Sequence, residues 1–196
     1  MGDTNILYYN KNPRKFSQET LSLDMEVAYS PFLSELSPRG SILDVGCGSG
    51  RDSLYFKNLG FAVVSMDPAR ALAELAEKEL GLKVQIGRVQ DLDNVEDFDG
   101  IWACASLLHV SHAEMLLVFQ KLAKALKPKG VLYCSYKYGE GEVEKGGRRF
   151  SNFNETDFKS FIKTTKLFET KQLWKTTDQR PNRGREQWLN ALVTKK

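Results

Sequence analysis

The sequence predicts an α/β fold: a doubly wound sheet of seven mostly parallel strands, with helices on both faces and one antiparallel strand near its C-terminal edge. Two observations carry this prediction. From Ser41 onward, short apolar stretches of strand length alternate with longer stretches whose apolar residues recur at helical spacing. Near the C-terminus, two strand-like stretches follow each other with no helical stretch between them, which indicates an antiparallel pair.

Seven stretches have the composition of strands, since they are short, apolar and rich in β-branched or aromatic residues. They lie at residues 41–45, 61–67, 83–87, 99–106, 131–139, 167–177 and 186–195. Four helical stretches lie between them, at residues 51–60, 68–81, 111–126 and 154–165. The signals for helix ends are Pro68 in a first turn, Gly60 and Gly81 as stops, the Ser111 to Glu114 capping box and Asn154 as an N-cap. The sequence KPKG at residues 127–130 predicts a turn.

The stretch LDVGCGSGRDS, residues 43–53, places three glycines between a predicted strand and a predicted helix. Glycine inside such elements costs about 0.5–1 kcal/mol relative to alanine, so these glycines need a structural reason. A tight turn is one reason, and a ligand lying against the main chain is another. Dinucleotide sites use the spacing GxGxxG, whereas this loop has GxGxG, preceded by Asp44. The spacing therefore favours a nucleotide-like ligand other than a dinucleotide.

The chain has the length and composition of one compact domain, with 196 residues, of which 41% are hydrophobic and 27% charged. Within it we expect a helical cap at residues 1–40, a cofactor-binding core at 41–138, and a substrate-side lid with the final strands at 139–196. Residues 139–149 contain four glycines and no apolar period, so we predict a mobile lid there.

The cysteines and the apolar runs indicate the cellular compartment of the protein. Cys47, Cys104 and Cys134 are odd in number and form no CxxC pair, and the chain has only two histidines, so we expect reduced thiols and no bound metal. No apolar run reaches the roughly 20 residues that cross a bilayer, and the first residues lack the apolar centre of a secretion signal. We therefore expect a cytoplasmic protein that does not enter a membrane.

The charge is unevenly distributed along the chain. Residues 137–196 hold 14 Lys and Arg against 8 Asp and Glu, a net +6, whereas residues 1–136 hold 14 against 17, a net −3. A partner near the C-terminal segment is therefore expected to be neutral or anionic.

Five stretches, in order, resemble motifs of the class I S-adenosylmethionine-dependent methyltransferases. They are LDVGCGSGR, VVSMD, VQDL, FDGIWACASLLHV and LKPKGVLY, and they span roughly residues 40–138. Within that family the chain is most similar to the small tellurite-resistance and thiopurine-like methyltransferases. The resemblance implies a Rossmann-like sheet and S-adenosylmethionine as the cofactor.

The resemblance also implies cofactor contacts. Gly46, Cys47 and Gly48 would let the methionine part approach the main chain, with Asp44 facing its amino group. Asp67 would accept hydrogen bonds from the ribose hydroxyls, because a carboxylate offers two acceptor oxygens. The remaining predicted contacts are Pro68, Gln90, Asp91 and Leu92 around the adenine, Cys104 and Ala105 after the fourth strand, and Tyr9 closing over the cofactor.

At each single position, a purely structural role is an alternative to ligand contact. Asp67 would equally cap the next helix, Tyr9 and Cys104 would equally pack in a core, and a turn glycine is often only a turn. Taken together, in order and at strand ends, these residues favour ligand contact.

His109 follows the fourth strand, where similar enzymes place residues that face the transferred methyl, and we predict that it orients or deprotonates a substrate. Packing or capping of the next helix is the alternative. Lys137, Tyr138, Arg148 and Arg180 are candidate substrate contacts because the C-terminal part is both basic and aromatic. The alternatives for them are a solvated basic face and phosphate contacts to nucleic acid.

These observations predict an S-adenosylmethionine-dependent methyltransferase that acts on a nitrogen, oxygen, sulfur or similar atom of a small molecule. DNA-base methylation is disfavoured, since the chain lacks the Asp/Asn-Pro-Pro-aromatic segment and the Pro-Cys nucleophile of those enzymes. Two other classes remain open: a non-catalytic module that binds S-adenosylmethionine or nucleic acid, and an NAD-dependent oxidoreductase.

Overall fold

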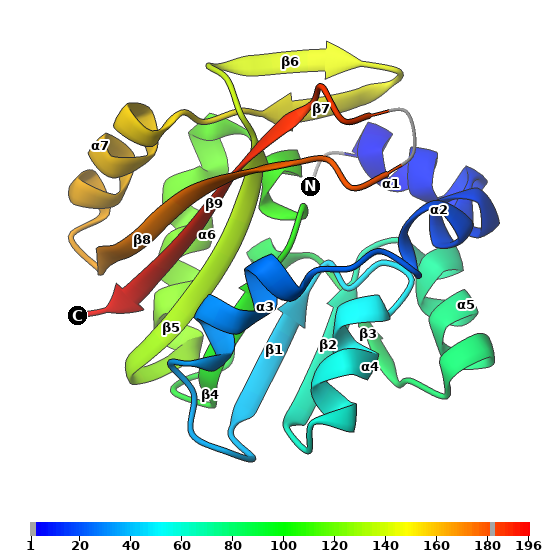
Figure 1. Ribbon diagram of the computed structural model, residues 1–196, viewed down its shortest axis with the longest axis horizontal. Helices are drawn as coiled ribbons and strands as arrows, with labels where there is room; N and C mark the ends of the chain where they lie inside the picture. The colour runs from blue at the N-terminus through cyan, green and yellow to red at the C-terminus, as the bar shows by residue number, and fades with distance from the viewer. Residues whose placement is uncertain (1–2, 181–182) are drawn as a thin grey trace.

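The computed structural model describes residues 3–180 and 183–196 and contains a seven-stranded sheet (Figure 1). Its strands are β1 Ser41–Val45, β2 Ala62–Asp67, β3 Val84–Ile86, β4 Phe98–Ala103, β5 Leu126–Lys137, β8 Phe168–Thr177 and β9 Gln187–Lys195. Their order is β3-β2-β1-β4-β5-β9-β8. Strand β9 lies between β5 and β8 and is antiparallel to both, and the other strand pairs of this sheet are parallel. The predicted fold class is confirmed.

Helices cover both faces of the sheet. They are α1 Asp3–Lys11, α2 Pro13–Thr20, α3 Glu26–Leu33, α4 Arg51–Asn58, α5 Arg70–Leu80, α6 His112–Ala125 and α7 Glu155–Thr165, with 3-10 turns η1 Val89–Asp91 and η2 Leu107–His109. Residues that alternate along a strand point to opposite faces. Ile101 therefore packs in one core with α6 and α7, and its neighbour Trp102 packs in the other with α3 and α4.

A glycine in the sheet brings α3 close to β4. A Cβ atom at Gly100 would lie 2.7 Å from Cζ of Phe32, a residue of α3 that is fully buried. Phe32 fills this space, and its ring centre lies 5.1 Å from that of Trp102, with the two rings tilted by 58°. The absence of a side chain at Gly100 thus sets the depth at which α3 docks on the sheet.

Several predicted boundaries differ from the structure. Helix α5 begins at Arg70, so Pro68 precedes the helix instead of forming its first turn. The burial of the segment predicted as a helix at residues 51–60 is also unexpected. Helix α4 buries two polar residues, Asp52 and Ser53, whereas the apolar Leu59 after it is 51% exposed. The predicted turn at 127–130 lies at the irregular start of β5, where pairing with β4 shifts register.

The segment predicted as a mobile lid, residues 139–149, contains most of a β-hairpin that the sequence analysis did not predict, while its mobility stays a prediction. Strands β6 Glu142–Lys145 and β7 Arg148–Ser151 pair antiparallel, and Gly146 and Gly147 form the turn with φ angles of 59° and 70°. Glycine at both central positions is typical of a tight two-residue hairpin turn. Two of the four glycines that suggested a mobile segment therefore form a turn.

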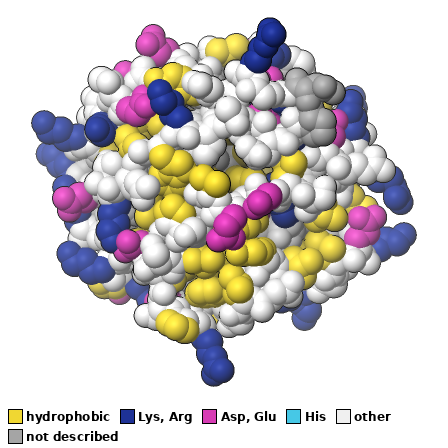
Figure 2. All heavy atoms as spheres, viewed as in Figure 1, with side chains coloured by type: hydrophobic (Ala, Val, Ile, Leu, Met, Phe, Trp, Pro, Cys, Tyr) yellow, Lys and Arg dark blue, Asp and Glu magenta, His cyan; other side chains and the backbone are white. Residues whose placement is uncertain are grey.

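Figure 2 shows hydrophobic side chains between charged ones over the face where α3 and α4 lie. By their exposed fractions, Val27 of α3 and Leu59, which follows α4, are solvent-exposed. Among the described residues, no helix has the length and apolar character needed to cross a membrane.

Candidate active site

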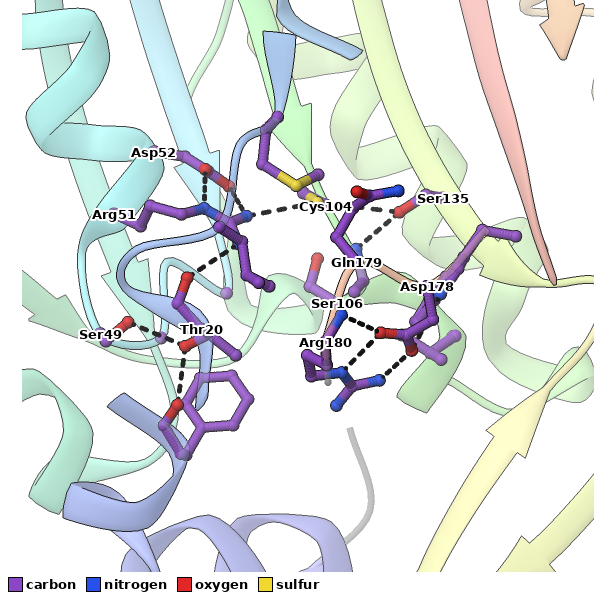
Figure 3. Close-up of a pocket in the computed structure, with 18 of the residues that line it drawn as sticks. Thr20, Ser49, Arg51, Asp52, Cys104, Ser106, Ser135, Asp178, Gln179 and Arg180 are labelled. Atoms are coloured by element: carbon purple, nitrogen blue, oxygen red, sulfur yellow. Dashed lines mark hydrogen bonds and ion pairs between the residues drawn. The ribbon is translucent and has the colours of Figure 1, made fainter. Parts of the chain in front are cut away.

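A pocket lies at the carboxyl ends of β1, β2, β4 and β5, beneath α1, α2 and the β6-β7 hairpin. Its empty space, including the part open to solvent, is about 1230 Å³. Ligands of doubly wound sheets bind at this edge, outside the carboxyl ends of the strands. Figure 3 shows Arg51 and Asp52 at one side of the cavity and Asp178 and Arg180 at the other.

The glycine loop forms the pocket floor beside β1 and β2. Gly46 and Gly48 have φ angles of 72° and 57°, which side chains rarely adopt. A Cβ atom at Gly46 would lie 2.5 Å from Cβ of Ser106, and one at Gly48 would lie 2.9 Å from Cε1 of Phe16. Both conformation and space therefore require glycine here.

Asp67 ends β2 and lines the pocket while being only 5% exposed. Its Oδ2 accepts a hydrogen bond of 2.9 Å from the backbone N–H of Gly48, and its Oδ1 accepts one of 2.7 Å from Ala69. Burial raises the pKa of Asp67 to about 6, and the two backbone donors oppose that rise. A carboxylate has about four acceptor sites, so sites remain for a ligand.

Asp44 lies below the floor and does not line the pocket. It is 1% exposed, and its Oδ2 accepts a 2.6 Å hydrogen bond from Ser53, which in turn accepts one from Ser65. Burial, with the charge of Asp52, raises the pKa of Asp44 to about 8. Its predicted contact with the cofactor amino group stays a prediction.

A buried network that the sequence analysis missed holds Arg51 against the pocket. Asp52 accepts two hydrogen bonds from Arg51, at 2.6 and 2.9 Å, one from Tyr29 at 2.5 Å and one from Trp102 at 2.8 Å. Burial by itself raises the pKa of Asp52, but the charge and hydrogen bonds of Arg51 bring it below its ordinary value. The Arg51 guanidinium is thus held charged, and its Nη2 donates to Cys104 Sγ at 3.7 Å in the pocket wall.

His109 and Tyr9 meet at the wall beneath the hairpin. His109 is 3% exposed, and its Nε2 lies 2.9 Å from the hydroxyl of Tyr9. Burial lowers the pKa of His109 to about 4, so the ring is neutral at physiological pH. The low pKa makes the imidazole a weak base. The role predicted for His109, to orient or deprotonate a substrate, stays a prediction.

Most of the predicted residues come together. Those that line the pocket are Tyr9, Gly46, Cys47, Gly48, Asp67, Cys104, Ala105, His109, Lys137, Arg148 and Arg180, while Asp44, Pro68, Gln90, Asp91, Leu92 and Tyr138 do not. Ala105 has a φ of 50°, unusual for a residue other than glycine and typical of functional sites. Burial raises the pKa of Cys104 to about 12, so its thiol stays protonated and is a poor nucleophile.

The fold is that of known methyltransferases. It matches the crystal structure of 1,6-didemethyltoxoflavin-N1-methyltransferase from Burkholderia thailandensis, which contains 1,6-didemethyltoxoflavin and S-adenosylhomocysteine. The TM-score is 0.79 over 97% of this chain and 85% of that one, at 21% identity. At this identity the likeness concerns the fold.

The sequence comparisons indicate the protein family. A family model described as a methyltransferase domain matches residues 42–130, the segment that contains the glycine loop and Asp67. This segment is a methyltransferase domain, and together with the fold it supports a class I S-adenosylmethionine-dependent methyltransferase. The cofactor predicted from the sequence, S-adenosylmethionine, follows from the family.

Curated relatives of this methyltransferase include an uncharacterized methyltransferase of Staphylococcus carnosus, 26% identical over 73% of this chain and 75% of the relative. A ubiquinone biosynthesis O-methyltransferase of Nitrobacter winogradskyi is 37% identical, over 48% of this chain and 37% of the relative. The chain thus spans much of the first relative and little more than a third of the second. The narrower likeness to tellurite-resistance and thiopurine-like enzymes stays a prediction.

The residues present fit S-adenosylmethionine. The glycine loop leaves its main chain accessible, and Asp67 keeps acceptor sites for two hydroxyls. Ser106 Oγ is buried in the pocket wall with no hydrogen-bond partner among the described residues (Figure 3), as expected of an atom that a ligand satisfies. Gly46, Gly48, Asp67 and Ser106 are the residues that would hold the cofactor.

The affinity for S-adenosylhomocysteine is expected to fall about tenfold from pH 7 to pH 5. Asp67 accepts hydroxyl hydrogen bonds best when ionised, and with a pKa of about 6 only about one molecule in ten is ionised at pH 5. Isothermal titration at the two pH values measures the change. The Asp67→Asn protein cannot ionise at this position, so it is expected to bind S-adenosylhomocysteine weakly and with the same affinity at both pH values. If both proteins lost affinity equally between pH 7 and pH 5, a group other than Asp67 would be responsible.

Proposed function

We propose that this methyltransferase acts on a small, anionic and aromatic acceptor bound beneath the β6-β7 hairpin. When bound, S-adenosylmethionine supplies a methyl group activated by its sulfonium. A lone pair of the acceptor forms the new bond to the methyl carbon, and the carbon–sulfur pair returns to sulfur to give S-adenosylhomocysteine. The protein contributes mainly by holding donor and acceptor in line.

The charge balance of the pocket wall supports an anionic acceptor. Its other cations have acidic partners: Arg51 pairs with Asp52, Lys137 with Glu186, Arg180 with Asp178, and Arg183 with Glu19. Arg148, from β7, has no acidic side chain within ion-pair distance among the described residues. Its buried Nε also has no hydrogen-bond partner there. This uncompensated guanidinium is the observation that carries the proposal.

Aromatic rings surround the same guanidinium. Its Cζ lies 4.1 Å from the ring centre of Tyr8 and 5.1 Å from that of Phe150, distances at which rings and cations attract. Phe150 and Trp188 line the pocket beside it. A planar acceptor would stack on these rings while its carboxylate, or a similar anion, receives the two parallel hydrogen bonds that an arginine fork offers.

Arg148→Met is expected to lower kcat/KM about tenfold to hundredfold for aromatic carboxylates, because a charge-assisted hydrogen bond is worth about 1.5–3 kcal/mol. Transfer of labelled methyl from S-adenosylmethionine measures this, with matched carboxylates and carboxamides as acceptors. The carboxamides are expected to be poor acceptors for both proteins.

Arg185→Met is the matched control, since Arg185 is exposed and lies outside the pocket. It removes the same charge from the same basic segment and is expected to leave transfer unchanged. An equal loss with carboxylates and carboxamides in Arg148→Met, or an equal loss in Arg185→Met, would contradict the proposed anion site.

A further inference from the structure

The hydrogen-bond partners of His109 fix which of its ring nitrogens carries the proton. Its Nδ1 lies 2.9 Å from the backbone carbonyl of Arg149, which can only accept, so Nδ1 carries the hydrogen. The ring is neutral, so Nε2 is a bare acceptor. The hydroxyl of Tyr9, 2.9 Å from Nε2, must therefore donate its proton to His109.

Three elements hold this arrangement in place. Asn5 of α1 is fully buried, and its amide donates to the Arg149 carbonyl at 3.0 Å and accepts from the Arg149 N–H at 2.8 Å. Tyr9 lies one turn further along α1, and His109 belongs to η2. Asn5 holds the Arg149 carbonyl of β7 in place, and this carbonyl accepts the hydrogen of His109 Nδ1. Asn5 therefore also fixes the tautomer of His109.

The direction of the Tyr9 hydrogen bond determines what its oxygen offers to the pocket. The only hydroxyl proton points to His109, so the oxygen has lone pairs alone for other partners. Arg148 Nη1 approaches that oxygen at 3.5 Å, the outer limit of a hydrogen bond, and leaves at least one lone pair unused. Tyr9 lines the cavity beside Arg148. Toward the pocket, Tyr9 is thus a hydrogen-bond acceptor.

We propose that the Tyr9 oxygen accepts a hydrogen bond from the atom that is methylated, which makes that atom an N–H or O–H nucleophile. The hydrogen is directed to Tyr9, and a lone pair of the nucleophile is free to face the methyl carbon. As that lone pair forms the bond and the carbon–sulfur pair returns to sulfur, Tyr9 holds the hydrogen in place, and the methylated atom, now positively charged, then releases this proton to water. His109 is a positioning residue that acts through Tyr9. This inference rests on the proposed function, of which it specifies the nucleophile.

The tautomer of His109 tests the inference without any acceptor. The chain has two histidines, so two-bond proton–nitrogen NMR of the intact protein resolves both rings, with His112→Gln to assign them. At pH 7 we expect His109 to be protonated at Nδ1 and bare at Nε2. His112, which is exposed, serves as the reference. Protonation of His109 at Nε2, or at both nitrogens, would overturn the inference, because the Tyr9 proton would then point elsewhere.

Methyl transfer tests the consequence for the acceptor. The probes are 3-hydroxybenzoate, 3-aminobenzoate and 3-mercaptobenzoate, which differ in the nucleophile alone. Tyr9→Phe is expected to lower kcat about tenfold for the hydroxyl and amino acceptors, with the thiolate rate and S-adenosylhomocysteine affinity unchanged within twofold. His109→Leu should reproduce this selective loss, and His109→Gln, which keeps an acceptor for Tyr9, should recover part of it.

Tyr55→Phe is the control, since it removes a hydroxyl that bonds Glu26 outside the pocket. Equal losses of all three acceptors in Tyr9→Phe, or a weaker affinity for S-adenosylhomocysteine, would overturn the inference. If the unmodified enzyme transfers methyl to none of the three probes, the proposed acceptor class fails, while the NMR result still decides the polarity of Tyr9.

Discussion

Replacing Asp52 by alanine is expected to lower the free energy of unfolding by about 3–5 kcal/mol, because one partner of a buried ion pair would be left without the other. Asp52 is 6% exposed and accepts hydrogen bonds from Arg51, Tyr29 and Trp102. Removing its carboxylate takes the acceptor away from four donor groups of three residues, and one of these residues is charged. Urea denaturation followed by tryptophan fluorescence and circular dichroism measures the loss.

Glu74→Ala is the matched control for this prediction. Glu74 forms an ion pair with Arg70 on α5, and its side chain is 63% exposed. Exposed pairs of this kind contribute between about 0 and 1 kcal/mol. A loss at Asp52 no larger than the loss at Glu74 would mean that water replaces the buried network at little cost.

Replacing Asp67 by alanine is expected to weaken S-adenosylhomocysteine binding about hundredfold or more. Two hydroxyl hydrogen bonds to a carboxylate are each worth about 1.5–3 kcal/mol, and both would be lost. Isothermal titration measures the affinity. Because Asp67 also holds the backbone N–H groups of Gly48 and Ala69, thermal denaturation of the variant is measured alongside.

Asp67→Asn and Asp93→Ala separate binding from folding in this test. The first keeps one acceptor oxygen and is expected to fall between the native protein and Asp67→Ala. The second removes an exposed carboxylate outside the pocket and is expected to bind normally. Undiminished affinity in a folded Asp67→Ala protein would contradict the placement of the ribose at this strand end.

The order of the elements and the glycine loop were predictable because their causes are local. Strand and helix periodicity follow from side-chain spacing, and the missing helix before β9 leaves only a hairpin connection. The spacing of Gly46, Gly48 and Asp67 along the chain was enough to predict a ligand site at the ends of β1 and β2. The hairpin at 142–151 was not predicted, because glycines mark both mobile segments and tight turns. Its strand pairing and the hydrogen bonds of β7 with the distant residue Asn5 appear only in the folded chain.

The direction of each side chain and its charge state depended on tertiary structure. Arg51 and Asp52 look like an ordinary solvated first turn of a helix, until Tyr29 and Trp102 bury them from other elements. His109 is a plausible base from its position after β4, but 100 residues separate it from the Tyr9 hydroxyl that occupies its Nε2. Arg148 is one of many cations in a basic segment. In the folded chain, α1 packs against β7 and brings the Tyr8 ring to Arg148, and no acidic side chain in the part of the chain that the structure describes lies within ion-pair distance of it. Partners are set by distance in space, which the sequence does not give.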